Sequence, residues 1–193
     1  GKADKLARRP EGVEKSQVRK LGILGAGMMG AGIAYVSAQA GIEVVLLDTS
    51  QEAAEKGKAY SESLLKKAIE RGKSTTDKAA ALLGLIKPTT SYHDLAGCDL
   101  VIEAVFESVK IKADVTAKTE AVVPESCIFA SNTSTLPITG LAEASERPEQ
   151  FIGIHFFSPV DKMPLVEVIL GKKTNDEAIA RSLDYIQQIR KTP

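Results

Sequence analysis

Short apolar segments alternate with longer polar or amphipathic segments along the chain from Val18 onward. The apolar segments have the length of buried strands, and those between them have the length and spacing of helices. Strands are predicted at residues 18–24, 42–47, near 86, 99–104, 127–130, 151–157 and 165–169, and helices at 28–40, 49–72, 78–84, 109–123, 138–145 and 175–191. Alternation this regular predicts one doubly wound α/β domain, with a mostly parallel sheet covered by helices on both faces.

The composition narrows the class of protein. Among the 193 residues, 25 are basic and 25 acidic, so a net charge of zero gives no basis for binding nucleic acid or an anionic membrane. No apolar run reaches the roughly 18 residues of a membrane span, and the polar N-terminus is unlike a secretory signal. His93, Cys98 and Cys127 have no partner pattern that indicates a disulfide or a zinc site. We therefore expect a soluble intracellular protein with reduced thiols.

Both ends of the sequence resemble cuts or linkers. Residues 1–17 are polar and lack an initiator Met, and the chain stops at Pro193 directly after a predicted helix. We expect residues 1–17 to be a linker and residues 18–193 to be one domain of a longer protein. A naturally short protein with processed ends is the alternative.

A glycine-rich turn, Gly25-Ala26-Gly27-Met28-Met29-Gly30, follows the first predicted strand and opens the first predicted helix. Its spacing is G-x-G-x-x-G. In a dinucleotide site Gly25 permits the sharp turn, Gly27 lets the backbone approach the pyrophosphate, and Gly30 lets the helix pack closely on the strand. The helix N-terminus then offers N–H groups to the phosphates. A tight turn without a ligand is the alternative, but the surrounding strand and helix favour dinucleotide binding.

Asp48, at the end of the second predicted strand, indicates which dinucleotide is bound. A carboxylate there accepts hydrogen bonds from both ribose hydroxyls and repels a 2′-phosphate, and no Arg follows to receive that phosphate. The sequence therefore favours NAD over NADP. A simple helix-start role for Asp48 is the alternative. The capping-box pattern Thr49-Ser50-Gln51-Glu52 weakens it, because Thr49 is expected to cap the helix.

His155 and Glu167 each interrupt an otherwise apolar predicted strand. A carboxylate buried among β-branched residues needs a partner, and the Pro-bounded loop of residues 158–164 allows the two strands to be neighbours. A Glu paired with an imidazole fixes its tautomer, which suits a general base working near neutral pH. A pair that only holds the strands together is an equally open interpretation.

The polar tract Ser131-Asn132-Thr133-Ser134 follows a predicted strand, at the carboxyl end where such sheets bind ligands. Its hydroxyls can hydrogen-bond a substrate oxygen or a nicotinamide. Taken alone, the tract more simply caps the helix that follows.

Together these motifs resemble the L-3-hydroxyacyl-CoA dehydrogenase family from about Val18 to Pro193. The motifs are Gly25–Gly30, Asp48, Glu103-Ala104-Val105-Phe106-Glu107, Ser131–Ser134 and His155-Phe156-Phe157-Ser158-Pro159-Val160. The particular likeness is to the dehydrogenase portion of multifunctional fatty acid oxidation α-subunits, where a polar linker follows an enoyl-CoA hydratase domain. The resemblance implies a Rossmann-type fold, NAD as cofactor, and oxidation of the 3-hydroxyl of an acyl-CoA in β-oxidation. It also implies an oligomeric parent protein, with a thiolase subunit as a candidate partner. The implied compartment is the bacterial cytoplasm or, in a eukaryote, mitochondria or peroxisomes.

The resemblance also assigns roles to single residues. The implied cofactor-binding residues are Gly25, Gly27, Met29, Gly30, Asp48, Glu107 and Lys112. His155 matches the general base, and Glu167 matches the carboxylate that orients it. Ser134 matches the serine that touches the substrate oxygen near the nicotinamide, and Ser63 is a candidate contact for CoA.

Two departures from the family pattern limit these assignments. Ser158 stands where many members have Asn, so an Asn–cofactor contact is not carried over, and a further family lysine in the Ser63 helix has no clear counterpart. The family's helical C-terminal domain, which supplies a catalytic asparagine, would begin past Pro193. We therefore expect this chain to bind NAD but to catalyse poorly or not at all alone.

Three functions are open at this stage. The first is the NAD-binding half of a 3-hydroxyacyl-CoA dehydrogenase. The second is a relative that acts on other 3-hydroxy acids, although such enzymes rely on a lysine base. The third is a non-catalytic NAD-binding or assembly module in which His155 and Glu167 are structural.

Overall fold

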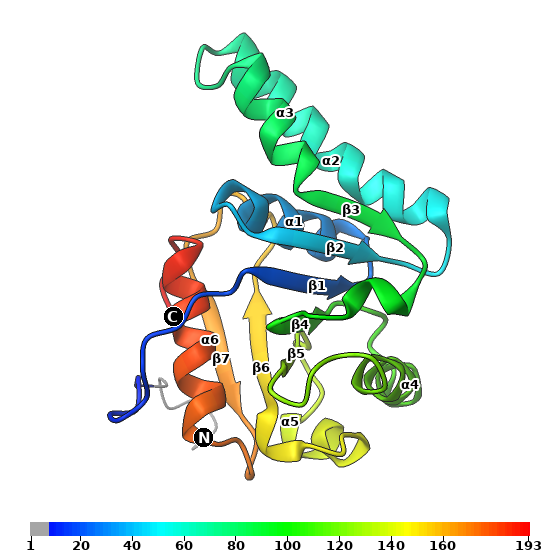
Figure 1. The fold of residues 1–193 in the computed structure, drawn as a ribbon, viewed down its shortest axis with the longest axis vertical. Helices are drawn as coiled ribbons and strands as arrows, with labels where there is room; N and C mark the ends of the chain where they lie inside the picture. The colour runs from blue at the N-terminus through cyan, green and yellow to red at the C-terminus, as the bar shows by residue number, and fades with distance from the viewer. Residues whose placement is uncertain (1–7) are drawn as a thin grey trace.

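The computed structural model describes residues 8–193, so residues 1–7 of the predicted linker lie outside it. Within this range seven strands form one sheet with helices on both faces (Figure 1). The strands are β1 (Lys20–Leu24), β2 (Glu43–Leu47), β3 (Ile86–Thr89), β4 (Leu100–Glu103), β5 (Ile128–Ser131), β6 (Phe151–Phe156) and β7 (Val166–Leu170). The α-helices are α1 (Met28–Gln39), α2 (Gln51–Glu70), α3 (Thr76–Gly84), α4 (Val109–Glu120), α5 (Ile138–Leu141) and α6 (Asp176–Gln188). The 3-10 helices are η2 (Tyr92–Leu95), η3 (Ala142–Ala144) and η4 (Pro148–Gln150).

The strand order is β3-β2-β1-β4-β5-β6-β7, and every pairing is parallel except β6 with β7. From β1 the chain crosses to β2 on one side, and from β3 it returns to β4 on the other. The chain connections that leave β1 and β4 therefore run in opposite directions along the sheet. In sheets of this kind, ligands bind in the crevice beyond the carboxyl ends of these two strands. The doubly wound, mostly parallel fold predicted from the sequence is confirmed.

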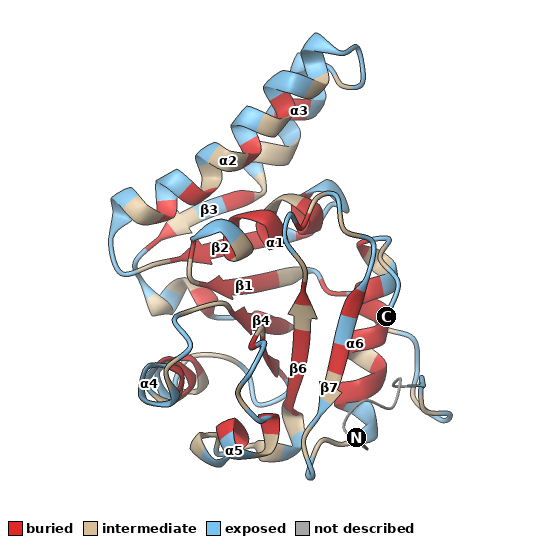
Figure 2. Cartoon of the chain, turned by 180° about the vertical axis from the view of Figure 1, so that it is seen from behind, coloured by how far each residue is buried: buried red, intermediate tan, exposed pale blue. Residues whose placement is uncertain are grey.

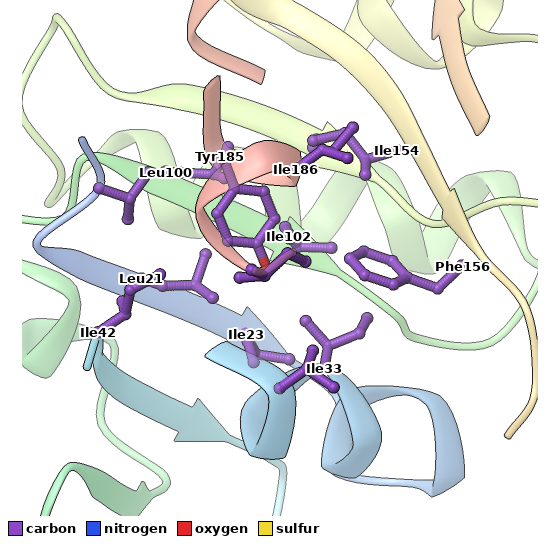
Figure 3. Close-up of a cluster of buried hydrophobic side chains, with 14 of the residues drawn as sticks. Leu21, Ile23, Ile33, Ile42, Leu100, Ile102, Ile154, Phe156, Tyr185 and Ile186 are labelled. Carbon is purple, nitrogen blue, oxygen red and sulfur yellow. The ribbon is translucent and has the colours of Figure 1, made fainter. Parts of the chain in front are cut away.

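Two hydrophobic clusters, one on each face, hold the sheet between its helices. Along β1, Leu21 and Ile23 belong to one cluster, and Leu24 belongs to the other. Figure 2 shows the central strands buried along their length, which explains why the sequence presents unbroken apolar runs instead of alternation. Figure 3 shows the larger cluster, where Tyr185 of α6 lies among aliphatic side chains. Its hydroxyl is 2.7 Å from Ser37 Oγ, so this buried polar group is satisfied.

Two predicted helices differ in detail from those of the structure. Ser50, not Thr49, caps α2: its side chain accepts the Ala53 N–H at 3.1 Å. The Thr49 hydroxyl instead donates to Asp48, at 3.3 Å. The helix predicted at 138–145 is α5 followed by the tighter turn η3, and Pro137 at its N-cap provides no side-chain cap. Adjacent hydroxyl residues make a cap position ambiguous by one residue when only the sequence is read.

Helices α2 and α3 project as an arm beyond the β3 edge of the sheet (Figure 1). On α2 only Ala54, Gly57, Ser61 and Leu65 are buried, and on α3 only Ala79. The arm is held near its base by Tyr60, whose hydroxyl donates to Asp161 at 2.7 Å; burial and this hydrogen bond raise the pKa of Tyr60 to about 12. Among residues 8–193 no helix combines the length and the apolar composition of a membrane span.

Residues 9–18 are hydrogen-bonded to α6, although the sequence analysis predicts that most of them belong to a linker. Arg9 donates to both carboxylate oxygens of Asp184, at 2.8 and 3.1 Å, and the Ser16 N–H donates to the same carboxylate at 3.0 Å. Next to it, Val18 exchanges two hydrogen bonds with the side chain of Gln188. We propose that the folded domain begins at or before Arg9.

Asp184→Asn is expected to lower the free energy of unfolding by about 1–3 kcal/mol at neutral pH, because the Asp184 side chain is only 2% exposed and loses a charged hydrogen-bond acceptor. Burial works to raise the pKa of Asp184, but the hydrogen bonds from Arg9 and Ser16 outweigh it and lower that pKa. A lowered folded-state pKa stabilises the fold above the unfolded-state pKa, about 4, and this contribution is lost as the pH falls through the folded value. Urea unfolding of both proteins between neutral and acid pH measures this, and a difference that does not shrink in acid contradicts the assignment.

Candidate active site and cofactor-binding site

The glycine loop joins β1 to α1 at the point where the connections diverge. Gly25 has φ +98°, and a Cβ there would lie 2.6 Å from the Ala104 carbonyl oxygen, just after β4. A Cβ on Gly30 would lie 1.7 Å from the Gly25 carbonyl oxygen, so the close approach of α1 to the loop requires glycine. A Cβ on Gly27, the N-cap residue of α1, would meet no described atom within 4 Å. Space is therefore left over the helix N-terminus, where a pyrophosphate is expected.

Asp48 follows β2 and is tied directly to the glycine loop. One carboxylate oxygen accepts the Ala26 N–H at 2.8 Å, and the other accepts the Thr49 N–H at 2.6 Å. The sequence analysis disfavours a simple helix-start role for Asp48 because it expects Thr49 to cap α2; that expectation is wrong, since Ser50 is the cap. The hydrogen bond from Ala26 now carries the argument for a binding role, because it places the Asp48 carboxylate beside the loop that would bind the dinucleotide.

Asp48→Ala is expected to weaken NADH binding by about tenfold or more and to narrow the preference for NADH over NADPH. The variant loses an acceptor for the ribose hydroxyls and the charge that repels a 2′-phosphate. Calorimetric titration with each dinucleotide measures both effects. Glu52→Ala is the matched control, since Glu52 is an exposed carboxylate in the first turn of α2. An unchanged ratio of the two affinities would contradict the role of Asp48.

A pocket of about 340 Å³ opens at the carboxyl edge of the sheet. Its lining includes four residues that the sequence singled out, namely Met29, Glu107, Ser134 and His155. The other lining residues are Ala104, Val105, Asn132, Phe156, Phe157 and Ser158. The fold thus brings one residue of α1, two of the loops after β4 and β5, and one of β6 to a single cavity.

His155 and Glu167 face each other across the antiparallel β6–β7 pair. His155 Nδ1 lies 2.9 Å from Glu167 Oε1, as the loop between the strands led us to expect. The expectation that Glu167 is buried is wrong: its side chain is 58% exposed, against 17% for His155, because β7 is the edge strand. With Nδ1 engaged, Nε2 is the imidazole nitrogen available to a ligand in the pocket, and the Phe157 ring packs edge-on against the imidazole at 4.8 Å between centroids.

The polar tract after β5 divides its roles between residues. The side-chain oxygen of Asn132 accepts the Phe156 N–H at 2.8 Å, which links the ends of β5 and β6. Thr133 Oγ1 accepts the Leu136 N–H at 2.9 Å and so closes the turn, but it does not cap α5 itself. Ser134 is exposed and lines the pocket with His155. The simpler expectation that the tract caps the following helix is therefore wrong in detail.

Glu107 and Lys112, both implied cofactor contacts, occupy different environments. Glu107 lines the pocket, and its carboxylate accepts the hydroxyls of Thr133 at 2.7 Å and Thr135 at 3.0 Å. Burial works to raise the pKa of Glu107, but these hydrogen bonds and the charge of Lys112 outweigh it and lower that pKa. Lys112 is buried outside the pocket lining, with its ammonium 3.2 Å from Glu107.

Ser63 and Ser158 differ in their relation to the pocket. Ser63 lies on the exposed side of the α2 arm, where its hydroxyl donates to the Tyr60 carbonyl at 2.7 Å. Ser158, at the departure from the family pattern, lines the pocket and is 3.3 Å from the sulfur of Met28. The structure therefore does not bring Ser63 together with His155 and Ser134 in one cavity.

A protein class follows from this geometry: domains that bind a dinucleotide at the carboxyl edge of a doubly wound sheet and present a histidine–carboxylate pair beside it. Within that class, the chain belongs to the 3-hydroxyacyl-CoA dehydrogenase family. Residues 20–193 match the family model for "3-hydroxyacyl-CoA dehydrogenase, NAD binding domain". NAD is accordingly the cofactor, as the sequence favoured.

Curated and solved relatives agree with this membership. The chain is 46% identical over 177 residues to the fatty acid oxidation complex subunit alpha of Psychrobacter arcticus, which covers 92% of this chain and 25% of that protein. The crystal structure of (S)-3-hydroxybutyryl-CoA dehydrogenase from Ralstonia eutropha superposes with a TM-score of 0.89 at 42% identity, over 92% of this chain and 62% of that one. The crystal structure of the dehydrogenase part of multifunctional enzyme 1 from C. elegans superposes with a TM-score of 0.82 at 30% identity. That match covers 93% of this chain and 41% of the other. The chain thus spans about a quarter of the length of these curated relatives.

The residues present fit NAD. The open space at Gly27 admits a phosphate to the α1 N-terminus, and Asp48 offers a carboxylate beside the same loop. Met29 and Glu107 line the adjoining pocket, which leads toward His155. The glycine loop, Asp48 and the pocket with His155 thus all lie at the carboxyl ends of the strands, where a dinucleotide is expected to bind.

Proposed function

We propose that this chain is the NAD-binding half of an L-3-hydroxyacyl-CoA dehydrogenase, which oxidises the 3-hydroxyl of an acyl-CoA to a ketone in fatty acid β-oxidation. The observation that carries this proposal is the placement of His155 and Ser134 in one pocket, with Glu167 bound to the far side of the imidazole. The names of the relatives support the substrate class, since they describe a fatty acid oxidation subunit and a 3-hydroxybutyryl-CoA dehydrogenase.

In the proposed mechanism His155 Nε2 accepts the proton of the 3-hydroxyl group as the C3–H bond breaks. Glu167 holds the proton on Nδ1, so that Nε2 presents its lone pair, and it stabilises the imidazolium that forms. The Ser134 hydroxyl donates to the substrate oxygen and keeps it near His155. Bound NAD⁺ supplies the hydride acceptor. Gly25, Gly27, Gly30 and Asp48 hold the cofactor in this proposal, with Met29 and Glu107 along its path and Ser63 as a contact for CoA.

The wider setting is also part of the proposal. Since the relatives are subunits of a bacterial fatty acid oxidation complex, we place the parent protein in the bacterial cytoplasm, as an oligomer with a thiolase subunit as a candidate partner. The present chain alone should bind NADH yet turn over poorly, because in the proposed enzyme a helical domain past Pro193 completes the substrate site.

Two chains test the proposal: this one, and one extended past Pro193 to include the helical domain of the proposed enzyme. Calorimetry of this chain should detect NADH binding, and the extended chain should oxidise NADH when given acetoacetyl-CoA but not when given acetoacetate. NADH binding without turnover in the extended chain would favour the alternative, a non-catalytic NAD-binding or assembly module. Equal turnover in the two chains would contradict the need for a further domain.

A further inference from the structure

A hydrogen bond joins helix α2 to the loop that follows β6, the strand that carries His155. The Tyr60 hydroxyl donates to the Asp161 carboxylate at 2.7 Å, between residues 101 positions apart in the sequence. Asp161 lies in the loop of residues 157–165, shortly after Ser158, which lines the pocket. Tyr60 and Asp161 themselves do not line the pocket. The bond therefore lies outside the acid–base pair, but it reaches the segment that forms part of the pocket wall.

The backbone on both sides of Asp161 is held in place. Val160 is only 2% exposed and packs on α1, where a Cβ on Gly32 would lie 2.7 Å from the Val160 Cβ. The Lys191 ammonium donates to the carbonyl of Val160, at 2.7 Å, and to that of Met163. The Asp161 carboxylate is therefore a fixed acceptor and not the tip of a free loop.

On α2, Tyr60 stands between the dinucleotide loop and the candidate contact for CoA. Gly57, one turn before Tyr60, lies against the glycine loop, since a Cβ there would be 2.9 Å from the Ala26 carbonyl oxygen. Ser63, one turn after Tyr60, donates its hydroxyl to the Tyr60 carbonyl at 2.7 Å. Helix α2 thus touches the cofactor loop, then the pocket loop, and then presents Ser63.

The arm has little else beyond Tyr60 to set its direction. On that part of α2 only Ser61 and Leu65 are buried, and on α3 only Ala79. An apolar contact would also hold the arm, but a hydrogen bond to a carboxylate is stronger than a neutral one and depends on direction. The Tyr60–Asp161 bond therefore fixes where the arm lies relative to the pocket.

We propose that Tyr60 and Asp161 are positioning residues for the substrate: their hydrogen bond fixes the arm against the pocket loop, and so sets the distance between Ser63 and His155. An acyl-CoA with its acyl end in the pocket has its nucleotide end on the arm, so this distance decides whether the two ends fit at once. The inference rests on the proposed function, because it requires a substrate that spans both places.

The test compares two substrates in the chain extended past Pro193: acetoacetyl-CoA, and acetoacetyl-N-acetylcysteamine, a short thioester without the nucleotide end of CoA. Tyr60→Phe removes only the hydroxyl and should lower kcat/KM for acetoacetyl-CoA about tenfold or more, while kcat/KM for the short thioester stays unchanged. Asp161→Ala should have the same effect. The double variant should be no worse than either single variant, because all three lose one and the same hydrogen bond. NADH affinity, measured by calorimetry, should not change.

Tyr35→Phe is the matched control. Tyr35, on α1, is half-buried near the same carboxylate, and burial and the charge of Asp161 raise its pKa. Its hydroxyl makes no hydrogen bond to another group of residues 8–193, so its loss should leave kcat/KM unchanged for both thioesters. Hydrogen exchange of the present chain adds a readout without turnover: in Tyr60→Phe the amide hydrogens of residues 61–65 should exchange faster, and those of the sheet at the same rate.

The outcomes separate the explanations. Equal losses of kcat/KM with both thioesters overturn the proposal, because the pocket itself would then be disturbed. An unchanged kcat/KM for acetoacetyl-CoA in Tyr60→Phe, unchanged exchange in the arm, or an equal loss in Tyr35→Phe also overturns it. If Asp161→Ala does not fold, Tyr60→Phe, which keeps the aromatic ring, decides between the same outcomes. Absence of turnover of either thioester by the unsubstituted extended chain is a different result: it contradicts the proposed function, and this inference falls with it.

Discussion

A chain carrying Gly30→Ala is expected to show no measurable NADH binding and to lose about 3 kcal/mol of folding free energy, the upper end of the usual range for overpacking. The added methyl group would lie 1.7 Å from the Gly25 carbonyl oxygen and 2.9 Å from its carbonyl carbon. Gly25 cannot yield easily, because its N–H donates to the Leu47 carbonyl at 2.8 Å and its φ is +98°. Helix α1 must therefore move away from β1, and its N-terminus moves with it. Urea unfolding and calorimetry measure the two losses.

Substitutions at two other glycines test folding and NADH binding separately. A Cβ on Gly27 meets no described atom within 4 Å, and the φ of Gly27 is an ordinary −71°, so Gly27→Ala should change the free energy of unfolding by less than about 1 kcal/mol. Its methyl group nevertheless occupies the space over the α1 N-terminus, and NADH binding should weaken about tenfold or more, equivalent to about 1.4 kcal/mol. Gly84→Ala, in open space at the end of α3, should alter neither property appreciably. Native NADH affinity in Gly27→Ala would show that the phosphates lie elsewhere.

His155→Gln, in a chain extended past Pro193, is expected to lower kcat by roughly 10² to 10⁴ while leaving NADH affinity unchanged. Glutamine keeps a polar group in the pocket but cannot accept and release a proton as imidazole does. Steady-state reduction of acetoacetyl-CoA measures kcat, and calorimetry measures NADH binding. His93→Gln is the matched control, since His93 is exposed in η2 and outside the pocket lining. An undiminished kcat in His155→Gln would leave only the non-catalytic module.

Most of the fold could be predicted because it depends on local signals. Continuous apolar runs such as 44–47 indicate strands buried on both faces, and Gly25 and Gly30 indicate a tight strand-to-helix turn. The first residue of a helix is harder to predict from sequence. Thr49 and Ser50 can both cap a helix, and only the path of the chain selects Ser50. The family, the cofactor and the His155–Glu167 contact were also foreseen, but the roles of the individual site residues remain predictions.

The parts that the sequence missed depend on which strands are neighbours. Glu167 reads as a buried charge among apolar residues, yet it is exposed because β7 is an edge strand. Asn132 gives no separate signal in the sequence, although its side chain joins the end of β5 to Phe156, the residue after His155 in β6. Glu103 is quoted only as part of a motif; its buried bond to Ser131 follows from the parallel register of β4 and β5, and its bond to Lys112 from the packing of α4 after β4. No periodicity along one chain segment reports contacts of this kind.

The arm formed by α2 and α3 contributes little to either hydrophobic cluster, and this has a consequence for local unfolding. Its outer part, around the turn at Gly72, buries only Leu65 and Ala79, whereas its base is held by Tyr60. Regions with few buried contacts open at a smaller free energy than the whole domain. Amide hydrogens of the arm beyond Leu65 should therefore exchange with solvent faster than those of the sheet. The tip of the arm then unfolds locally while the dinucleotide loop stays folded.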